Sequence, residues 1–312
     1  MVRSCSQERL SSLVKGWIDM ARVPFHTVGI MPFILGTVLA WKQTGVFNPI
    51  VFSLSLLALI MVMLTVYASG EYYDLEGDRL TAQLEKNAFS GGSQAVVKGL
   101  IPASHAWVTS LAAAGAAGAI GLALQFYYHT GPWTIPMGTI GLSSAFFYST
   151  KPVRLVKRGV GELFIGFCYG WLTIATGYYL QTAHLSPLVY WMSFPIALSI
   201  FNVILINEFP DYPADVIEGK ANLVVRFGKE TCSIVYALTS IVTALSFAAA
   251  IPAGAPMLSW VFFPPVAALS LYPAWGMTRG HYKDRRKLER MCAITITLNL
   301  LVALSYILGL VL

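Results

Sequence analysis

The chain has 312 residues, of which 56% are hydrophobic and only 12% are charged, with a formal net charge of +6. Soluble globular domains carry about 25% charged residues, so this composition excludes an ordinary soluble domain and indicates an integral membrane protein. The four cysteines have no C-x-x-C spacing and give no indication of a disulfide framework or a zinc site, and the basic charge gives none of nucleic-acid binding.

The first predicted element is an amphipathic helix at residues 7–21. Its apolar residues recur at helical spacing and are Leu10, Leu13, Val14, Trp17, Ile18 and Ala21. The other faces carry Glu8, Arg9, Ser12, Lys15 and Asp19. This pattern predicts a helix that lies in the interface of the inner leaflet, with a partner-binding helix as the alternative.

Nine long apolar segments follow, each about as long as the 20 residues with which a helix crosses roughly 30 Å of hydrocarbon. The predicted spans are 24–42, 50–70, 105–126, 132–149, 160–181, 187–207, 231–252, 256–275 and 290–311. The predicted fold is therefore all-α. We expect residues 1–312 to form a single domain, a polytopic membrane bundle of nine transmembrane helices.

The basic residues predict the orientation of this bundle. All but one of the 21 lysines and arginines, Lys42, lie in the N-terminal tail or in the loops after the even-numbered spans. The positive-inside rule therefore places the N-terminus and these loops in the cytoplasm. The acidic residues fall on the same side, so no acidic residue lies in a predicted outer loop. We expect the protein in the cell (inner) membrane of a bacterium or archaeon.

Two acidic clusters follow spans two and six directly. The first reads Glu71-Tyr-Tyr-Asp74-Leu-Glu-Gly-Asp78, and the second reads Asn207-Glu208-Phe-Pro-Asp211-Tyr-Pro-Ala-Asp215. In both clusters a glutamate is followed by an aromatic residue and two aspartates at the same offsets. This weak repeat predicts two similar half-bundles that bring the clusters together across one cavity. The clusters begin loops of about 30 and 20 residues, a length that is usual for functional loops.

The spacing of the acidic side chains predicts that they gather on helix faces. Residues three or four apart share one face, so Glu71, Asp74 and Asp78 are expected to form one stripe. The second cluster has the same spacing if the helix of span six continues, but Pro210 and Pro213 argue that it unwinds there.

Carboxylates packed this closely repel one another and raise one another's pKa, and a divalent cation removes that penalty. Oxygen ligands favour Mg²⁺, which takes one or two carboxylates and leaves positions for water and phosphate. The predicted metal ligands are Asp74, Asp78, Asp211 and Asp215. The alternative is a solvated helix end with ordinary loop acids.

Basic and glycine-rich segments near these clusters predict a phosphate ligand. Lys151, Arg154, Lys157 and Arg158 follow span four, and Lys220 and Arg226 follow the second acidic cluster. The turn Gly91-Gly92-Ser93-Gln94 can offer backbone N–H groups to a phosphate oxygen. The basic cluster at 279–290 lies far from both acidic motifs in the sequence, and we assign it to orientation and lipid contact.

The two acidic clusters resemble the aspartate-rich motifs of the UbiA superfamily of intramembrane prenyltransferases. The resemblance continues in Arg22-Val-Pro-Phe-His-Thr, Phe89-Ser-Gly-Gly-Ser93, Tyr148-Ser-Thr-Lys151-Pro-Val-Arg154 and Gly219-Lys220-Ala-Asn-Leu-Val-Val-Arg226-Phe-Gly228. The second and fourth of these segments are most similar to the 1,4-dihydroxy-2-naphthoate prenyltransferases of menaquinone synthesis. The chain departs from the family at Gly70-Glu71, where many relatives have Asn-Asp, and at Pro210 and Pro213.

The resemblance implies transfer of a polyprenyl group from an allylic prenyl diphosphate to an aromatic quinone precursor, by Mg²⁺-assisted ionisation and electrophilic aromatic substitution. It implies that one Mg²⁺ lies on Asp74 and Asp78 and a second on Asp211 and Asp215. The diphosphate ligands that it implies are Arg22, Lys151, Arg154, Asn207, Lys220 and Arg226. Glu71 and Glu208 are the candidates for the base, or they orient the residues around the substrate. The candidate aromatic partners of the carbocation are Tyr67, Tyr72, Phe147, Tyr148 and Phe209.

Two alternatives remain at this point. The acceptor can instead be a phenol, a protohaem or a glycerol-phosphate lipid, all within the same family. The alternative from another class is an ion-coupled transporter, because acidic residues inside a membrane often mark ion pathways. A transporter is expected to place its acids near the membrane midplane and to use both faces, whereas both clusters here lie on the cytoplasmic side.

Overall fold

The computed structural model describes residues 2–84 and 92–312, with the side chains of residues 2–10 excepted. The elements are α1 (Val2–Ala21), η1 (Val23–His26), α2 (Thr27–Thr44), α3 (Pro49–Tyr73), α4 (Leu75–Gln83), α5 (Ala103–Phe126), α6 (Thr134–Ser149), η2 (Leu155–Lys157), α7 (Gly161–Ile165), η3 (Gly166–Leu172), α8 (Thr173–Thr182), α9 (Pro187–Glu218), α10 (Leu223–Ala250), η4 (Met257–Phe262), α11 (Phe263–Thr278), η5 (His281–Lys283) and α12 (Arg285–Val311). The described part of the chain contains helices and no strand, which confirms the predicted all-α fold.

Eight helical segments of the described chain are long and apolar enough to cross a membrane. They coincide with eight of the nine predicted spans. The remaining prediction, 132–149, corresponds to α6, whose 16 residues fall just short of the usual spanning length. The helices are therefore where the hydropathy placed them, and the predicted count of nine spans is not confirmed.

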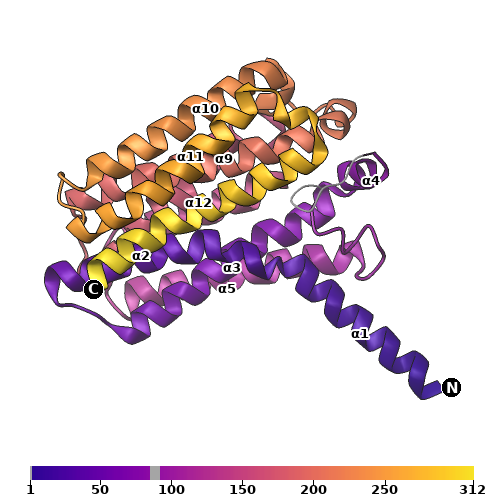
Figure 1. Cartoon of the computed structure of the whole chain (residues 1–312). Coiled ribbons are helices and arrows are strands. Elements are labelled where there is room, and N and C mark those ends of the chain that lie inside the picture. Colours follow the sequence, from indigo (N-terminus) through magenta and orange to yellow (C-terminus); the bar gives the residue numbers. More distant parts are fainter. Residues whose placement is uncertain (1, 85–91) are drawn as a thin grey trace.

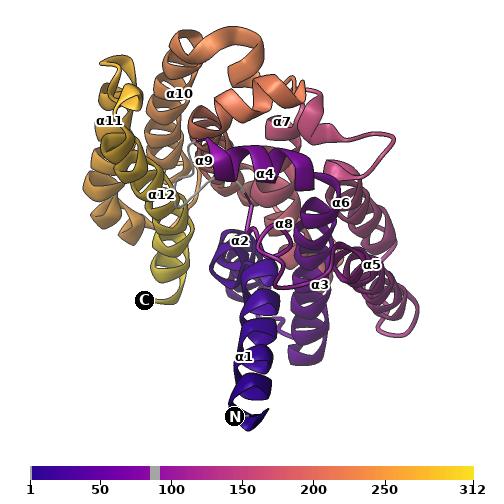
Figure 2. The same cartoon turned by 90° about the vertical axis from the view of Figure 1, so that its right-hand side faces the viewer.

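The long helices form two groups that enclose a shared centre. Helices α9, α10, α11 and α12 pack against one another, and α3, α5 and α6 form the other group (Figure 1). Helices α2 and α8 lie between the groups and contact both of them. The short helix α4 crosses one end of the bundle and packs against α9 (Figure 2). This end carries both acidic clusters.

Helices α2 and α8 approach each other closely because each has a glycine at the crossing. A Cβ atom on Gly36 would lie 2.0 Å from the carbonyl oxygen of Ile174, and one on Gly177 would lie 2.3 Å from the carbonyl oxygen of Phe33. Small residues at a helix crossing let two backbones pack directly, which is the main source of helix association inside a bilayer.

We expect Gly177→Ala to destabilise the protein, because the new methyl group has to push the two backbones apart. Overpacking of this kind costs about 1–3 kcal/mol. The matched control is Gly115→Ala on α5, since a Cβ atom there meets nothing within 4 Å. Thermal unfolding of the purified variants in detergent measures the difference. Equal midpoints for the two variants would show that the α2–α8 crossing has room to relax.

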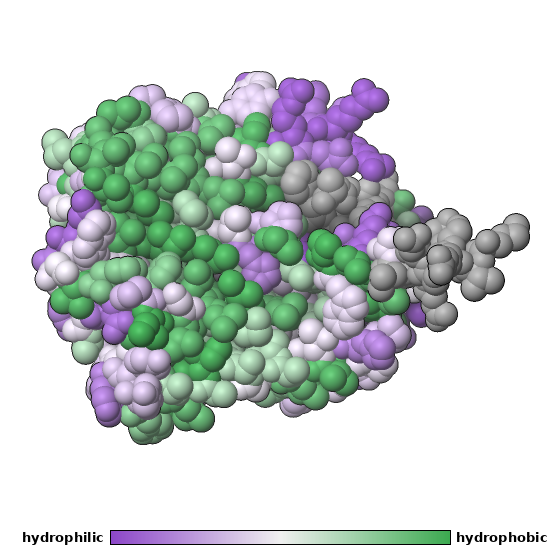
Figure 3. Space-filling model, turned by 90° about the horizontal axis from the view of Figure 1, so that it is seen from below, coloured by the Kyte–Doolittle hydropathy of each residue, from purple (hydrophilic) through white to green (hydrophobic). Residues whose placement is uncertain are grey.

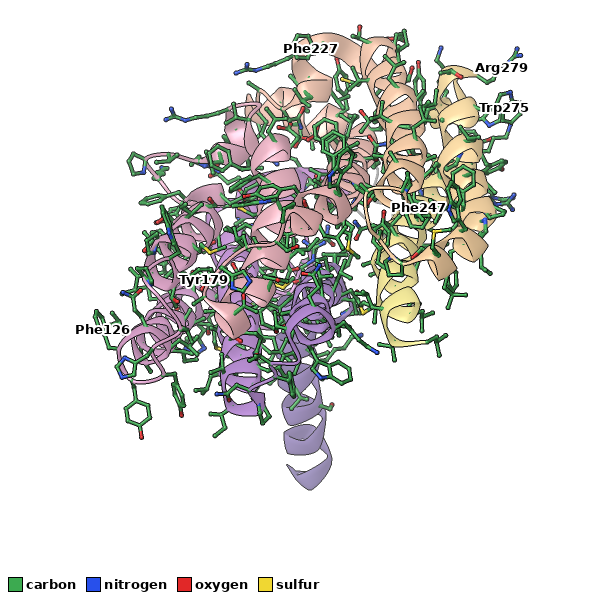
Figure 4. The ribbon with its side chains drawn as sticks, turned by 90° about the vertical axis from the view of Figure 1, so that its left-hand side faces the viewer. Phe126, Tyr179, Phe227, Phe247, Trp275 and Arg279 are labelled. Atoms are coloured by element: carbon green, nitrogen blue, oxygen red, sulfur yellow. The ribbon has the colours of Figure 1, made fainter. Side chains whose placement is uncertain are left out.

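The face of the bundle seen in Figure 3 is largely apolar, with hydrophilic residues gathered toward its edges, as expected of a lipid-facing surface. Phe126 and Trp275 point away from the helices, and their side chains are exposed (Figure 4). Phe247 instead lies inside, with its ring stacked on Tyr306 at 4.8 Å between centroids. Apolar residues therefore occupy both the inside and the outside of the bundle, which fits a protein in lipid.

Helix α1 projects away from the bundle (Figure 1). Leu13, Val14, Trp17 and Ile18 are exposed on it, whereas Gly16 and Met20 pack against the rest of the chain. A continuous exposed apolar stripe on a projecting helix is typical of a helix that lies in a membrane interface. The interfacial role of residues 7–21 stays a prediction.

Helix α9 corrects the expectation that span six unwinds at its prolines. The helix runs without interruption from Pro187 to Glu218 and includes both Pro210 and Pro213. Proline removes one backbone hydrogen bond and disfavours a helix interior. Here the loss is offset by packing, because Phe209, Ala214 and Asp215 are all buried. The second acidic cluster is therefore the last turns of a helix and not the start of a long loop.

The loop after α9 is shorter than the predicted length of about 20 residues, because α9 ends at Glu218. Helix α10 begins at Leu223, although its helical geometry breaks at Gly228, where φ is 82° and ψ is 159°. A positive φ of this size favours glycine. The predicted span began only at residue 231 because Arg226, Lys229 and Glu230 interrupt the apolar pattern before it.

The first acidic cluster was predicted to lie on one helix, but the helix breaks within it. Helix α3 ends at Tyr73, and Asp74 is the residue at which the chain turns into α4, with φ −102° and ψ 12°. Glu71 therefore lies on a different helix from Asp78. The two clusters resemble each other in sequence, but one is a bend between two helices and the other is a continuous helix.

Candidate active site

A cavity of about 660 Å³ lies between α3, α5, α6, α8 and α9. Its polar end is lined by the residues of the two acidic clusters, and its body is lined by apolar side chains of the membrane helices. All four predicted metal ligands, Asp74, Asp78, Asp211 and Asp215, line its polar end. The bend at Asp74 and the continuous helix α9 thus bring distant parts of the sequence to one place.

In each motif one aspartate is held by a basic residue and by a neutral side chain. An Arg154 Nη atom lies 2.8 Å from Asp74 Oδ1, and Ser149 donates a hydrogen bond to the other carboxylate oxygen of Asp74. The second motif repeats the arrangement with different partners.

In the second motif, Lys220 Nζ lies 2.9 Å from Asp215 Oδ1, and the Asn222 side-chain amide donates to Asp215 Oδ2 at 2.7 Å. The carboxylates are therefore partly neutralised by cations that belong to neighbouring segments. The same two cations are among the predicted diphosphate ligands.

Asp78 lies where negative charge is most crowded. Burial and the nearby carboxylates of Glu71 and Asp74 raise the pKa of Asp78 to about 8. Asp211 adds to this effect across the cavity. The turn at Gly92 closes over the carboxylate, since a Cβ atom there would lie 2.6 Å from Asp78 Oδ2 and the φ of Gly92 is 61°. A cation in this position would favour the ionised form of Asp78.

The donor set of this end fits Mg²⁺ held together with a phosphate ligand. In the described residues no three histidine, cysteine or acidic side chains form a ready-made metal cage. Each motif supplies only a pair of carboxylates, and the buried Oδ1 of Asn207 has no hydrogen-bond partner. Mg²⁺ usually takes one or two carboxylates and completes its shell with water and substrate phosphate oxygens.

The two glutamates that precede the aspartates hold backbone N–H groups. Glu71 is buried, and its carboxylate accepts hydrogen bonds from the N–H and hydroxyl of Ser93 and from the N–H of Val96. Glu208 accepts from the N–H of Val224 at 3.3 Å, at the start of α10. Each glutamate therefore fixes the segment that follows its own motif.

The turn that follows the first motif contains Gly92, Ser93 and Gln94, for which we predicted backbone donors to phosphate. The N–H of Ser93 instead donates to Glu71 Oε1 at 2.9 Å. Gly91 lies outside the described residues.

The remaining predicted diphosphate ligands do not all reach the cavity. Arg22 lines it, and its guanidinium lies over the ring of Phe25 at 4.5 Å and over that of Tyr67 at 5.5 Å. Lys151 and Arg226 are exposed and lie outside the cavity lining. The structure thus brings Arg22, Asn207 and Lys220 to the cavity wall. Lys151, Arg154 and Arg226 lie outside the lining, although Arg154 reaches the lining residue Asp74 at 2.8 Å.

The apolar body of the cavity can hold a long hydrocarbon chain. Small residues of α5 line it, together with Cys168, Tyr169 and Leu172 of the π-helix η3, and Tyr67 and Tyr148 lie close to the polar end. Of the five aromatic residues that we considered as carbocation partners, only these two belong to the lining. Phe209 is buried in a separate apolar cluster beside α10 and α12, and Tyr72 stacks on Trp107.

Two carboxylates that the sequence analysis did not single out belong to this region. Glu162 lines the cavity, and its Oε1 accepts from the N–H of Leu223 at 2.9 Å, beside the contact of Glu208. Glu218 binds the basic residues next to the cavity. Neither stands in a repeated spacing, so the sequence pattern carried no signal for them.

The sequence was compared with known families, and the model of the UbiA prenyltransferase family matches residues 30–310. The chain belongs to the UbiA prenyltransferase family. This match covers both acidic motifs and all the membrane-crossing segments from α2 onward, and it confirms the predicted resemblance to the family.

Individual relatives are more distant. A 2-carboxy-1,4-naphthoquinone phytyltransferase of Synechocystis sp. is 26% identical over 243 residues, which are 72% of this chain and 70% of that protein. A 1,4-dihydroxy-2-naphthoate octaprenyltransferase of Bacillus subtilis is 25% identical over 202 residues, 65% of this chain and 62% of that protein. UbiA prenyltransferase domain-containing protein 1 of Dictyostelium discoideum is 23% identical over 214 residues, which are 68% of this chain and 63% of that protein. The matches to the last two proteins span less than two thirds of their length.

Solved structures share the fold across nearly the whole chain. A digeranylgeranylglyceryl phosphate synthase superposes with a TM-score of 0.65 and 17% identity, covering 96% of this chain and 99% of that one. A UbiA homologue from Archaeoglobus fulgidus bound to DMAPP and Mg²⁺ superposes with a TM-score of 0.62 and 16% identity, covering 92% and 98%. These likenesses show that the helical bundle is that of the family.

Proposed function

We propose that the protein transfers a polyprenyl group from an allylic prenyl diphosphate to a naphthoate-type aromatic acceptor at the cytoplasmic face of the membrane. The observation that carries this proposal is the single cavity with four aspartates at its polar end and an apolar body behind them. The two naphthoate prenyltransferases among the relatives support the acceptor class. Membership of a prenyltransferase family favours this function over an ion-coupled transporter.

The polar end provides groups of both signs for a metal-bound diphosphate. Asp74 and Asp78 would hold one Mg²⁺ and Asp211 and Asp215 a second, as in the proposal from the sequence. The A. fulgidus homologue of the same fold was solved with DMAPP and Mg²⁺, which supports a metal-bound prenyl diphosphate as the ligand. Bound Mg²⁺ would supply positive charge next to the leaving diphosphate, which lowers the barrier to ionisation.

Arg154 and Lys220 stand beside the same aspartates and can bind the diphosphate oxygens. The guanidinium of Arg154 presents a planar fork of donors, and the ammonium of Lys220 is a compact charge. Stabilising the diphosphate as its negative charge grows favours cleavage of the C–O bond and leaves an allylic carbocation. The acceptor ring forms a C–C bond to this cation and then loses a proton from the attacked carbon, which the released diphosphate can accept. The faces of Tyr67 and Tyr148, which line the cavity near the aspartates, can stabilise that cation and exclude water from it.

The contacts of Glu71 and Glu208 favour an orienting role over that of a base. Glu71 already accepts hydrogen bonds from two backbone N–H groups, and Glu208 accepts one. A proton gained by either glutamate would weaken these bonds and release the segment that it holds. We therefore assign Glu71 to the turn after the first motif and Glu208 to the start of α10.

Product analysis tests the proposed function. The purified protein in lipid nanodiscs is incubated with radiolabelled prenyl diphosphates and a panel of 1,4-dihydroxy-2-naphthoate, a phenol, protohaem and a glycerol-phosphate lipid, with Mg²⁺ or with EDTA. We expect a prenylated naphthoate and released diphosphate with Mg²⁺, and neither with EDTA. A product from another acceptor alone would overturn the naphthoate assignment. No product from any acceptor would overturn the proposed activity.

A further inference from the structure

Glu218 is a largely covered carboxylate that lies beside the cations of the site. It is the last residue of α9, three positions after Asp215, and its side chain is 9% exposed. It does not belong to the cavity lining. Its position next to a cavity that is rich in carboxylates needs an explanation, because a buried charge is costly unless it is paired.

Three basic residues surround this carboxylate. Glu218 Oε1 lies 2.8 Å from Lys157 Nζ and 3.9 Å from an Arg154 Nη atom, and Glu218 Oε2 lies 3.2 Å from Lys220 Nζ. Lys157 also donates to the backbone carbonyl of Glu218 at 3.3 Å. Glu218 therefore connects the loop after α6, which carries Arg154 and Lys157, to the segment after α9, which carries Lys220.

The first acidic motif closes the remaining side of Glu218. A Cβ atom on Gly77, between Asp74 and Asp78, would lie 2.1 Å from Glu218 Oε2. The carboxylate thus occupies space that only a glycine leaves open on α4. Glu218 follows the second motif in the sequence. Its side chain lies against the first motif and binds the basic residues between the two motifs.

The ion pairs of Arg154 and Lys220 explain why a further carboxylate lies beside these two residues. Arg154 is shared between Asp74 and Glu218, and Lys220 is shared between Asp215 and Glu218. When a metal takes Asp74 and Asp215, each cation loses one of its two carboxylate partners. Glu218 stays available to both, because it lies outside the cavity lining, as Arg154 does, and so does not compete for the space in which metal and diphosphate would bind.

We propose that Glu218 is a positioning residue that keeps Arg154 and Lys220 aimed at the diphosphate once metal has taken their aspartate partners. This inference rests on the proposed function, since it assigns the two cations to the diphosphate of the donor. Glu218 acts through these cations and contacts neither the acceptor nor the hydrocarbon tail. Loss of Glu218 is therefore expected to weaken binding of the prenyl diphosphate and to leave binding of the acceptor unchanged.

The first test is Glu218→Gln, which keeps the shape of the side chain and removes its charge. We expect the KM for geranylgeranyl diphosphate to rise about tenfold, with the KM for the acceptor unchanged. Binding of inorganic pyrophosphate with Mg²⁺, measured by calorimetry without any acceptor, is expected to weaken by the same factor. Glu218→Asp, which keeps the charge, is expected to recover part of the loss. Unchanged pyrophosphate binding in Glu218→Gln overturns the proposal.

The second test moves the carboxylate without removing it. Gly77→Ala pushes Glu218 off the cations, so we expect it to reproduce the donor KM and the pyrophosphate affinity of Glu218→Gln. The double variant is expected to resemble either single variant, because both act on the same contact. Gly115→Ala, whose Cβ atom meets open space, is the matched control. Additive losses in the double variant overturn the proposal.

The two tests also separate this inference from the proposed function. Wild-type protein that binds pyrophosphate and forms product, beside a Glu218→Gln variant with wild-type affinity, overturns only the role of Glu218. Wild-type protein without product overturns the proposed function itself. If Glu218→Gln cannot be recovered folded, the comparison of Gly77→Ala with Gly115→Ala decides the question.

Discussion

Asp74→Asn and Asp211→Asn are each expected to abolish nearly all prenyl transfer while the protein stays folded and inserted in the membrane. Each substitution keeps the shape of the side chain and removes a negative charge from the polar end of the cavity. Loss of one strong electrostatic contact in an active site typically lowers kcat about 10²–10³-fold. Rates of product formation in nanodiscs, with thermal unfolding to check the fold, measure the effect.

The control for this pair is Glu289→Gln. Glu289 is an acidic residue on α12 that pairs with Arg285 at 3.4 Å, away from the cavity. We expect this variant to keep wild-type activity. If Asp74→Asn or Asp211→Asn keeps more than about half of the wild-type rate, the aspartates do not hold the metal that the reaction needs.

Arg154→Ala and Lys220→Ala are expected to weaken binding of the prenyl diphosphate strongly and to slow its ionisation. Both basic residues lie within 3 Å of a motif aspartate, Arg154 at 2.8 Å and Lys220 at 2.9 Å. A hydrogen bond to a charged group contributes about 1.5–3 kcal/mol, which corresponds to roughly 10- to 150-fold in the KM for the donor. Titrations with the donor and with pyrophosphate measure both effects.

Arg285→Ala separates a phosphate site from simple membrane topology. Arg285 lies in the last basic cluster, and its side chain is 67% exposed. Positive charge on the inner face would by itself explain every basic residue of the chain except Lys42. We therefore expect Arg285→Ala to bind the donor like the wild type. If all three variants behave alike in the diphosphate titrations, the two basic residues do not form a specific phosphate site.

The membrane helices were predictable from the sequence because hydropathy is a local property. The segment 160–181 became α7, η3 and α8, and 105–126 became α5, with ends shifted by only a few residues. The continuation of α9 through Pro210 and Pro213 was not predictable, since it depends on burial of Phe209, Ala214 and Asp215 against other helices. Local helix propensity contains no information about those contacts.

The candidate site shows the same division. The four aspartates were found from their spacing, because two equivalent clusters after apolar segments are a visible pattern. The partners of Glu71 and Glu208 and the place of Glu218 depend on which loops meet at the end of the bundle. Lys151 and Arg226 have the same sequence context as Arg154 and Lys220, and only the three-dimensional structure separates the two pairs.

The most direct test of the account is a structure of the protein with Mg²⁺ and a non-hydrolysable prenyl thiodiphosphate. The account predicts diphosphate density between the aspartates of the two motifs, with metal on Asp74, Asp78, Asp211 and Asp215 and the hydrocarbon tail in the apolar body of the cavity. Diphosphate bound elsewhere, or metal that contacts neither motif, would contradict it.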